Sequence, residues 1–450
     1  MGKIFGTDGI RCIVNTEPLT AETTLKISKT VGYLLKSKKS NNSRVIICKD
    51  TRLSGYLYEP LITAGFISMG MEVILVGPLP TPAVPHLMRT LRADIGVMIT
   101  ASHNTYEYNG IKFFNLDGFK ISSKLEKEIE NIVLNKKKYS KILNSNNKTG
   151  KAIRLEDASG RYSEFLKSTL NKNIKTKKLK IVLDCGNGAT YDIAPSIFWE
   201  LGHQVVSINN KPNGKNINYN CGAVNVGSLC KKVVEEKADI GFAFDGDGDR
   251  LIVVDDKGNE IDGDKIIALF AKNLINEKKI NSKFPVITTV MSNLGLENFL
   301  LNDLGIKLKR SPVGDINVIE EMKKNKSFLG GEQSGHIILS DFSKTGDGIL
   351  AALKITEIIS IIKQSTSYIF DLYDNFPQIK VNISYKKISE KNKKNLKQLN
   401  NKNSKDKKTR VLIRLSGTEP LIRLLVEGKD LLEVKLKAKT LESEIRRLIG

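Results

Sequence analysis

One pattern occurs three times in this chain and limits the folds that it can adopt. An apolar strand leads into a polar or glycine-containing turn, a helix follows, and a Met-Gly or Leu-Gly pair precedes a second strand. The copies begin at Arg44 ("RVIICKDTRLSG"), Lys180 ("KIVLDCGNGAT") and Phe284 ("FPVITTVMSNLG"). The glycine fits a helix C-cap. A strand–helix–strand unit implies parallel pairing with a right-handed crossover, so the copies predict three related mixed α/β domains.

The C-terminal part of the chain follows a different pattern. "TRVLIRLSGTEPLIRLLVEG", from Thr409, reads as two strands around a loop, and the helical sequence "DLLEVKLKAKTLESEIRRLI" comes after it. A chain of 450 residues is too long for one hydrophobic core. We therefore expect an α/β protein with a smaller C-terminal α+β domain, and domains at 1–155, 156–255, 256–370 and 371–450.

The net charge of +22 is the one unusual feature of the composition. The basic residues concentrate in Lys/Asn-rich stretches that begin at Asn135, Asn171 and Lys386. These stretches lack the regularly interleaved aromatic residues of a base-stacking surface, which disfavours a nucleic-acid partner. We interpret them as solvated connectors, and the stretch over 386–408 as an insertion or hairpin at the edge of the last domain.

The cysteines and the apolar runs bear on the cellular compartment of the protein. The five cysteines are scattered and never spaced C-x-x-C, which argues against a disulfide framework or a zinc site. No apolar run is long enough for a signal peptide or a membrane span. We therefore expect a cytoplasmic protein without a membrane partner.

The segment "FAFDGDGDRLIVVD" carries the strongest chemical signal. Asp245, Asp247 and Asp249 alternate with glycines after an apolar strand, so the carboxylates can converge on one cation. Oxygen ligands that leave room for a phosphate suit Mg²⁺. An EF-hand is excluded because Arg250 and Asp256 stand where its glycine and glutamate belong. The alternative is an acidic turn, which rarely holds three aspartates, and we predict a site for one Mg²⁺.

Two further loops have side chains suited to ligand binding. "GGEQSGHI" places Glu332 and Ser334 among glycines, where they can bind vicinal sugar hydroxyls, although a glycine-rich turn is the alternative. "RLSGTEPLIR" combines guanidinium groups, hydroxyls and exposed amides, which suit a phosphate pocket, although a basic edge strand is the alternative. The candidate residues of this second loop are Arg414, Ser416, Gly417, Thr418 and Arg423.

Ser102 follows an apolar strand-like run and stands directly before His103 in "MITASHN". Alone, it would be interpreted as a helix N-cap. No Walker A loop occurs, and no G-x-S-x-G elbow surrounds this serine. A metal site, a sugar-binding loop and a phosphate pocket together imply phosphoryl transfer on a sugar. Ser102 is then predicted to carry the phosphoryl group.

Over nearly its whole length the chain resembles the α-D-phosphohexomutase superfamily. The shared motifs, in the family order, are "FGTDGIR", "DTRLSG", "TPAV", "TASHN", "NGIKFF", "DGDGDR", "GEQSGH" and "SGTEP". The resemblance implies four domains around a central cleft and a phosphoserine at Ser102. It implies Mg²⁺ held by that phosphate and by Asp245, Asp247 and Asp249. Sugar contacts fall to Glu332 and Ser334, and the distal phosphate to Arg414, Ser416, Gly417, Thr418 and Arg423.

The resemblance also implies charge-stabilising and proton-handling groups in the cleft. They are Arg11, Lys112, Arg250 and His336, and we add His103 because it adjoins Ser102. Five positions depart from the family pattern: Thr105 replaces a usual proline, Cys12 and Cys48 stand where glycines are common, and Ile316 and Asn317 replace a usual arginine and tyrosine. None of these departures removes a core catalytic residue.

The implied activity is that of an isomerase. It interconverts a sugar 6-phosphate and a sugar 1-phosphate, with a sugar 1,6-bisphosphate as intermediate and activator. Gln333 favours glucosamine phosphate as substrate, since the glucose and mannose enzymes usually have methionine there. The product would feed UDP-N-acetylglucosamine and cell-wall precursor synthesis. A glucose or mannose phosphate mutase and a metal-dependent phosphatase remain alternatives, and a homodimer is left open.

Overall fold

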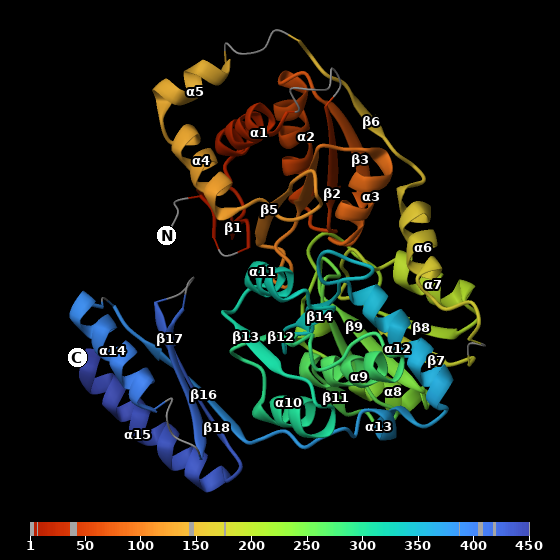
Figure 1. Ribbon diagram of the computed structural model, residues 1–450. Coiled ribbons are helices and arrows are strands. Elements are labelled where there is room, and N and C mark those ends of the chain that lie inside the picture. Colours follow the sequence, from red (N-terminus) through yellow and green to blue (C-terminus); the bar gives the residue numbers. More distant parts are fainter. Residues whose placement is uncertain are drawn as a thin grey trace.

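The computed structural model describes residues 4–6, 8–36, 43–143, 148–174, 177–386, 388–403, 408–416 and 420–449. Among these residues the strands form four sheets, which follow one another along the chain (Figure 1). We name the corresponding parts of the chain the first region (4–157), the second region (158–261), the third region (263–369) and the fourth region (378–449). The α/β fold class is confirmed, with a smaller last region. In this part of the chain, no helix is long and apolar enough to cross a membrane.

The first sheet has the strand order β1-β5-β4-β2-β3-β6. Strand β5 runs antiparallel to both of its neighbours, and the pairings of β2, β3, β4 and β6 are parallel. The strands are β1 (Ile10–Ile13), β2 (Arg44–Lys49), β3 (Glu72–Pro78), β4 (Ile95–Ile99), β5 (Tyr108–Phe114) and β6 (Ala152–Arg154). The helices are α1 (Ala21–Leu35), α2 (Gly55–Ser68), α3 (Ala83–Leu91), α4 (Ser123–Val133) and α5 (Lys136–Leu143).

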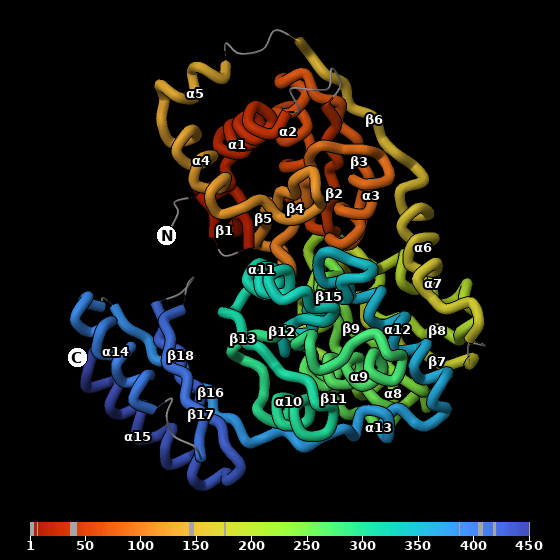
Figure 2. The backbone as a smooth tube through the Cα atoms, in the orientation of Figure 1, coloured from red at the N-terminus to blue at the C-terminus, as the bar shows by residue number. Residues whose placement is uncertain are grey.

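The second sheet has the order β11-β10-β9-β7-β8. It is reached from the first along β6 and α6, which run down one side of the molecule (Figure 2). The strands are β7 (Lys180–Asp184), β8 (Gln204–Ile208), β9 (Ile240–Phe244), β10 (Leu251–Val254) and β11 (Glu260–Ile261). The helices are α6 (Ala158–Ser168), α7 (Ile193–Glu200), the 3-10 turn η1 (Gly222–Val224) and α8 (Gly227–Glu236).

The third sheet has the order β13-β12-β14-β15. The strands are β12 (Val286–Thr289), β13 (Leu308–Ser311), β14 (Leu329–Gly331) and β15 (Ile337–Leu339). The helices are α9 (Gly263–Asn276), α10 (Leu294–Asn298) with the π-helical turn η2 (Phe299–Asp303), α11 (Asp315–Asn325), α12 (Gly348–Ile362) and α13 (Thr366–Ile369). Helix α12 is buried on nearly every side because it packs on β9 and β10 as well as on β15, so the second and third regions share a core.

The first three sheets contain one common unit, as the threefold sequence pattern predicts. In each, a central strand has two parallel neighbours, and a fourth strand pairs antiparallel with one of these: β3-β2-β4-β5, β8-β7-β9-β10 and β13-β12-β14-β15. The predicted cap glycines Gly70, Gly202 and Gly305 have φ of 73°, 85° and 67° before the returning strands. The loops between the third and fourth strands are therefore equivalent in position, and they contain Ser102, Asp245 and Glu332 respectively.

The fourth sheet is antiparallel, with the order β16-β18-β17. It consists of β16 (Gln378–Ser384), β17 (Thr409–Leu415) and β18 (Leu421–Gly428), and it packs against α14 (Glu390–Asn403) and α15 (Leu431–Ile449). Its core is formed by apolar residues of the strands and of both helices.

The Lys/Asn-rich stretches are not connectors throughout, and this prediction is wrong for two of them. In the stretch over 386–408, residues 390–403 form helix α14, in which Leu396 and Leu399 are buried. Asn400 Oδ1 accepts a hydrogen bond of 2.7 Å from the backbone N–H of Ile413 on β17. In the stretch from Asn135, helix α5 buries Ile142. A few apolar residues at helical spacing are enough to dock a helix whose composition is otherwise that of a solvated segment.

Candidate active site

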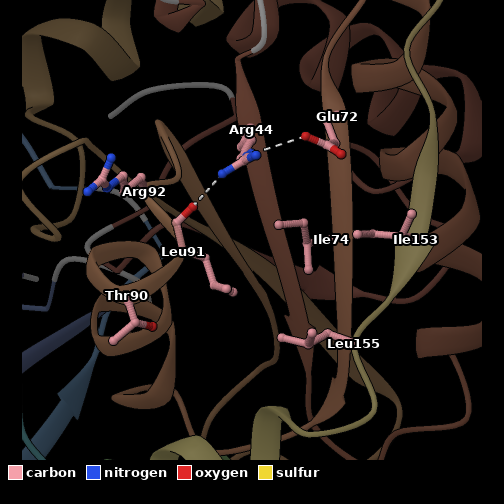
Figure 3. Close-up of a pocket in the computed structure, with 8 residues that line it drawn as sticks. All are labelled: Arg44, Glu72, Ile74, Thr90, Leu91, Arg92, Ile153 and Leu155. Atoms are coloured by element: carbon pink, nitrogen blue, oxygen red, sulfur yellow. Dashed lines mark hydrogen bonds and ion pairs between the residues drawn. The ribbon is translucent and has the colours of Figure 1, made fainter.

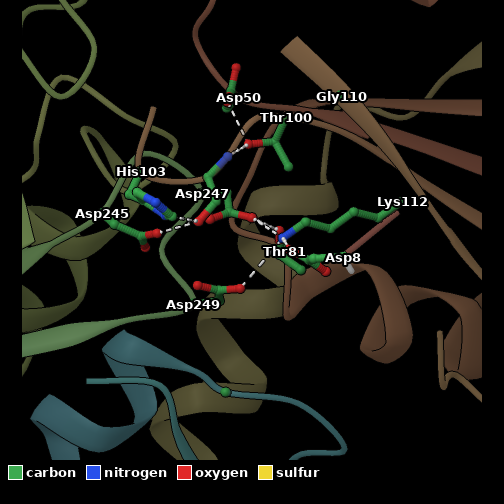
Figure 4. A network of polar contacts seen from close by, with 12 residues as sticks. Asp8, Asp50, Thr81, Thr100, His103, Gly110, Lys112, Asp245, Asp247 and Asp249 are labelled. Atoms are coloured by element: carbon green, nitrogen blue, oxygen red, sulfur yellow. Dashed lines mark hydrogen bonds and ion pairs between the residues drawn. The ribbon is translucent and has the colours of Figure 1, made fainter. Parts of the chain in front are cut away.

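The strand-joining loops of the first two sheets meet at one place (Figure 4). The β4–β5 loop carries Ser102, and the β9–β10 loop carries Asp245, Asp247 and Asp249. The Ser102 hydroxyl is buried and donates a hydrogen bond of 2.8 Å to Asp245 Oδ2. The structure thus brings together the serine and the three aspartates that the sequence singled out.

Ser102 has an unusual backbone conformation. Its φ of 50° lies in the left-handed region, which residues other than glycine adopt only where their surroundings require it. Its N–H donates to Thr100 Oγ1 at 2.8 Å, and the Thr100 hydroxyl donates to Asp50 Oδ2 at 2.6 Å. Asp50 in turn forms a buried ion pair of 2.8 Å with Arg52. This chain of contacts fixes the serine and directs its hydroxyl at Asp245.

Arg52 also holds the carbonyl side of the serine loop. It donates hydrogen bonds to the carbonyl oxygens of Ser102 at 2.9 Å and Asn104 at 2.7 Å, and it contacts that of Thr105. Because the bond goes to a carbonyl oxygen, Thr105 in place of proline keeps this contact. Asn218, from the second region, donates to the carbonyl oxygens of Ser102 at 2.8 Å and Asn104 at 2.9 Å. The loop is therefore fixed from both regions.

The three aspartates form a compact buried cluster, with ligand oxygens within 4.8 Å of one another. Burial, together with Asp249 and Asp247, raises the pKa of Asp245 well above its ordinary value. Burial would also raise the pKa of Asp247, but Lys112 and Thr81 outweigh it and lower that pKa. In the described part of the chain, Oδ1 of Asp247 and Oδ1 of Asp249 have no hydrogen-bond partner. Such buried, unpartnered carboxylate oxygens fit a hard divalent cation.

Lys112 brings a positive charge against this cluster. Its ammonium lies 2.9 Å from Asp247 Oδ2, 3.6 Å from Asp249 Oδ2 and 3.2 Å from Asp8 Oδ2. Burial would lower the pKa of Lys112, but these carboxylates outweigh it and raise the pKa well above its ordinary value. Lys112 is thus a fixed cation in the site.

His103 and Arg11 flank the serine. The Nδ1 atom of His103 lies 3.5 Å from Ser102 Oγ. Burial, followed by the charges of Arg250 and Arg11, lowers the pKa of His103 to about 3, so its imidazole is neutral. Arg11 forms an ion pair of 3.0 Å with Asp8. Both predicted residues therefore lie at the site.

Arg250 and His336 connect the loops of the second and third sheets through an isolated β-bridge. Arg250 Nε lies 4.0 Å from Asp245 Oδ2 and 3.9 Å from Asp249 Oδ1. His336 Nε2 lies 3.9 Å from Asp249 Oδ2 and accepts a hydrogen bond of 3.2 Å from the N–H of Gly346. The third loop thereby reaches the carboxylate cluster.

The other predicted residues of the third loop are less enclosed. Glu332 is half-buried and accepts a hydrogen bond of 3.1 Å from the N–H of Gly314, and Ser334 is exposed. Gln333, between them, accepts a hydrogen bond of 3.0 Å from Lys380 on β16. The loop therefore offers a carboxylate and a hydroxyl to a ligand, while Gln333 contacts the fourth region.

The strands on either side of the fourth loop, β17 and β18, each carry an arginine. Arg414 on β17 and Arg423 on β18 are paired residues in the sheet, and both are half-buried. Burial and the charge of Arg423 lower the pKa of Arg414. Ser416 directly follows β17, but the predicted positions Gly417 and Thr418 lie outside the described residues.

Several residues of the site were not predicted from the sequence. Asp8, Arg52 and Thr81 lie within "FGTDGIR", "DTRLSG" and "TPAV", so the motifs themselves were a signal that could have found them. Lys120 and Asp315 form an ion pair that connects the first and third regions. They lie outside these motifs, and no local pattern marks them.

A separate cavity of about 430 Å³ lies in the first region (Figure 3). Its lining includes Ile74 and Leu155, and its rim is held by Arg44, which bonds Glu72 at 3.0 Å and the carbonyl of Leu91 at 3.1 Å. None of the predicted site residues lines it.

Known proteins match this chain over its whole length. The phosphoglucomutase/phosphomannomutase family matches in four parts: α/β/α domain I over residues 2–140, domain II over 160–258, domain III over 262–376 and the C-terminal domain over 379–441. The phosphoglucosamine mutase of Parvibaculum lavamentivorans is 48% identical over 430 residues, which is 95% of each chain. That of Thermodesulfovibrio yellowstonii is 46% identical over 456 residues, covering 100% of each chain.

Solved structures share the fold. A phosphoglucomutase/phosphomannomutase family protein of Burkholderia thailandensis has a TM-score of 0.80 at 23% identity, covering 99% of this chain and 96% of its own. The Aspergillus fumigatus N-acetylphosphoglucosamine mutase, solved in complex with GlcNAc-6P and magnesium, has a TM-score of 0.63 at 16% identity, covering 99% of this chain and 96% of its own.

Proposed function

The chain belongs to the phosphoglucomutase/phosphomannomutase family, whose members are phosphohexomutases, and we propose that it interconverts glucosamine 6-phosphate and glucosamine 1-phosphate through a phosphoserine at Ser102. One observation carries this proposal: the Ser102 hydroxyl lies 2.8 Å from Asp245 in a buried cluster of three aspartates. The curated relatives quoted above, at 46–48% identity over 95–100% of this chain, are phosphoglucosamine mutases.

Asp245, Asp247 and Asp249 would hold the metal together with the serine phosphate. A phosphate on Ser102 would bring nearly two negative charges against the carboxylates, which requires a compensating cation. When bound, Mg²⁺ neutralises charge on the transferring phosphoryl group. The Aspergillus fumigatus relative was solved with magnesium, which supports this choice of ion.

The chain's own residues supply positioning and proton handling. The hydroxyl of the sugar phosphate attacks the phosphorus, the bond from phosphorus to Ser102 Oγ breaks, and a sugar 1,6-bisphosphate results. The hydroxyl proton is lost to a base, and Ser102 Oγ regains a proton when it leaves. His336 is the candidate base and the charged Lys112 is the candidate proton donor, because they lie on two sides of the carboxylates, 3.9 Å from Asp249 and 2.9 Å from Asp247. Arg11 and Arg250 add positive charge, and neutral His103 lies beside Ser102 Oγ.

The bisphosphate then turns over and returns its other phosphate to Ser102. This requires a distal phosphate site that accepts either end of the molecule. Arg414 and Arg423 on facing strands would form it with the backbone and hydroxyls of 416–418. Closure of the fourth region over the cleft would exclude water and prevent hydrolysis.

The sugar would be held by the third loop. Glu332 and Ser334 can bond vicinal hydroxyls, and Gln333 adjoins them in the sequence. The closest rival functions are a glucose or mannose phosphate mutase and a phosphatase. We propose further that the domains are those expected above, that the protein acts in the cytoplasm, and that its product enters UDP-N-acetylglucosamine and cell-wall precursor synthesis.

The test is an isomerisation assay with purified protein. We expect glucosamine 6-phosphate to be converted to glucosamine 1-phosphate in the presence of Mg²⁺ and a trace of glucosamine 1,6-bisphosphate. Glucose 6-phosphate and mannose 6-phosphate, assayed in parallel, should react more slowly. Release of inorganic phosphate in proportion to substrate loss would instead identify a phosphatase, and a preference for a neutral sugar would refute the proposed substrate.

A further inference from the structure

Lys120 connects the two sides of the site through carboxylates to which the proposed function gives no role. Its side chain is 7% exposed, and its ammonium forms ion pairs with Asp8 of the first region and with Asp315, the first residue of α11 in the third. Asp8 lies 3.2 Å from the Lys112 ammonium, and Asp315 lies 3.9 Å from His336 Nε2. One carboxylate therefore separates Lys120 from each candidate proton-handling group.

The backbone of Lys120 is fixed by the strand that also carries Lys112. After β5 the chain makes a tight turn, in which Asn115 N–H donates to the Phe119 carbonyl at 2.8 Å. The turn ends where Lys120 forms an antiparallel bridge with Phe114, the last residue of β5. Both lysines thus project from one rigid hairpin, and their separation does not depend on how the regions are arranged.

The network is fully charged. Burial would raise the pKa of Asp8 and of Asp315, but the neighbouring cations, Lys112 for Asp8 and Lys120 for Asp315, outweigh it and lower both. Burial would lower the pKa of Lys120, but Asp315 and Asp8 raise it. Charges alternate along the series Lys112, Asp8, Lys120, Asp315. Buried charges persist only when paired, so loss of Lys120 leaves the buried Asp315 without this cation, and leaves the partly exposed Asp8 to Lys112 and Arg11.

We propose that Lys120 is a positioning residue for the reaction: by holding Asp8 and Asp315, it fixes Lys112 and His336 on either side of the carboxylate cluster. The inference rests on the proposed function, because Lys120 acts through those two groups. Without Lys120, Asp8 competes more strongly for the Lys112 ammonium and draws it from Asp247. Of Lys120 and His336, Asp315 then keeps only His336, and its carboxylate turns the imidazole ring of His336.

A rival explanation is that Lys120 only docks the third region on the first, and Lys344 provides a matched control. Lys344, in the third region, donates a hydrogen bond to the carbonyl of Asp117 in the same turn, and its ammonium lies 4.9 Å from the centre of the Phe119 ring. It therefore joins the same two regions at the same turn, but it lies on the surface and outside the charged network. A purely docking role predicts equal effects of the two lysines.

The experiment measures kcat and KM for glucosamine 6-phosphate in four proteins: wild type, Lys120→Met, Lys344→Met and Lys120→Arg. We expect kcat of Lys120→Met to fall on the order of 10- to 100-fold, the range seen when partners of site residues are removed, with KM changed by less than about threefold. Lys344→Met should keep kcat within about threefold of wild type. Lys120→Arg, which keeps the charge, should recover kcat to within about tenfold. Unchanged kcat in Lys120→Met, or equal losses in both methionine variants, overturns the inference.

A second variant keeps the inference testable if Lys120→Met does not fold. Asp315→Asn preserves shape and removes the carboxylate through which Lys120 reaches His336. We expect kcat of Asp315→Asn to fall with KM nearly unchanged. In the double variant Lys120→Arg/Asp315→Asn, the fold-loss of kcat should equal the larger of the two single losses, because the two residues act in series. Multiplied losses, or wild-type kcat in Asp315→Asn, overturn it. Lack of isomerase activity in the wild type refutes the proposed function itself, which distinguishes the two failures.

Discussion

The loops of the second and fourth sheets carry opposite charges and differ in how they are built into the molecule. The aspartate loop is buried and receives bonds from the first region: Ser102 donates to Asp245 at 2.8 Å and Lys112 to Asp247 at 2.9 Å. The arginine loop lies on a sheet that stands beside the third region (Figure 1), and its Arg414 and Arg423 are half-buried. The aspartates of one loop and the arginines beside the other therefore differ in burial as well as in charge.

The fourth sheet docks at the end of its strands that is remote from the arginine loop. Arg410, near the start of β17, forms an ion pair of 3.0 Å with fully buried Glu427, near the end of β18. Arg410 also donates to the Ser292 carbonyl at 3.0 Å, and Glu427 accepts from the N–H of Leu294 at 2.8 Å. The centre proposed for phosphoryl transfer is therefore preassembled, whereas the arginines proposed to bind phosphate lie toward the end of the sheet opposite to these docking contacts. A small rotation at the docked end would move them furthest.

The serines of the two sites give the sharpest test of this comparison. Ser102→Ala should abolish isomerisation, because its hydroxyl is the proposed carrier of the phosphoryl group. Ser416→Ala should raise KM by no more than about tenfold, through loss of one hydrogen bond worth about 0.5–1.5 kcal/mol. Steady-state kinetics and intact-mass analysis check this, since only proteins that retain Ser102 should show a population heavier by one phosphate. Near wild-type turnover in Ser102→Ala would remove the serine from the mechanism.

The metal provides the second test. Asp249→Asn keeps the shape of a side chain whose Oδ1 has no hydrogen-bond partner among the described residues. We expect Mg²⁺ affinity to fall about tenfold or more, which corresponds to about 1.4 kcal/mol for one charged ligand. Calorimetry measures the affinity.

Chelation extends this test to the whole protein. EDTA should stop turnover, and added Mg²⁺ should restore it. Asp117→Asn, at an exposed turn, is the control and should bind Mg²⁺ normally. Activity that persists after chelation and dialysis would count against the site.

The third test concerns the arginines of the fourth sheet. Arg423→Ala should raise KM on the order of 10- to 100-fold, because a charge-assisted bond to phosphate is worth about 1.5–3 kcal/mol, with a smaller change in kcat. Arg446→Ala, in the same region on α15, removes an exposed arginine paired with Glu442 at 2.7 Å and should leave both constants unchanged. Equal effects of the two substitutions would mean that net charge, rather than the loop, attracts the substrate.

Much of the fold could be predicted because its signals are local. In each repeated unit the apolar strand and the cap glycine lie within a short stretch of sequence. The spacing of Asp245, Asp247 and Asp249 already predicts that their carboxylates converge on one point. The partners that assemble the site could not be predicted in this way. Lys120 and Asp315 are 195 positions apart, and Asn218 reaches Ser102 from 116 positions away. Only the tertiary fold brings such residues together.

Helix α14 shows the opposite kind of failure, in which composition concealed a local pattern. Leu396 and Leu399 are spaced by three and both are buried, yet they stand among Lys and Asn residues that suggested a solvated segment. The amphipathic stripe is narrow: the buried residues of the helix are Leu396, Leu399 and Asn403, and the helix packs against β17 and α15.

The last and smallest effect on activity is expected from α14. Leu399→Ala should lower the free energy of unfolding by about 2–4 kcal/mol, since the side chain is 6% exposed and packs in the core of the fourth region. It should change KM only slightly, because α14 supports β17 near Ile413, next to Arg414, but does not contribute a binding group.

Replacement of the exposed Lys394 and Lys397 with glutamine should alter neither stability nor KM, since charges more than about 8–10 Å from the substrate are screened at physiological salt. Chemical denaturation and steady-state kinetics on both proteins separate these effects. If the lysine replacements raised KM while Leu399→Ala left stability intact, α14 would be a binding surface rather than a supporting helix. The contrast between the buried aspartate loop and the docked fourth sheet would then have to include it.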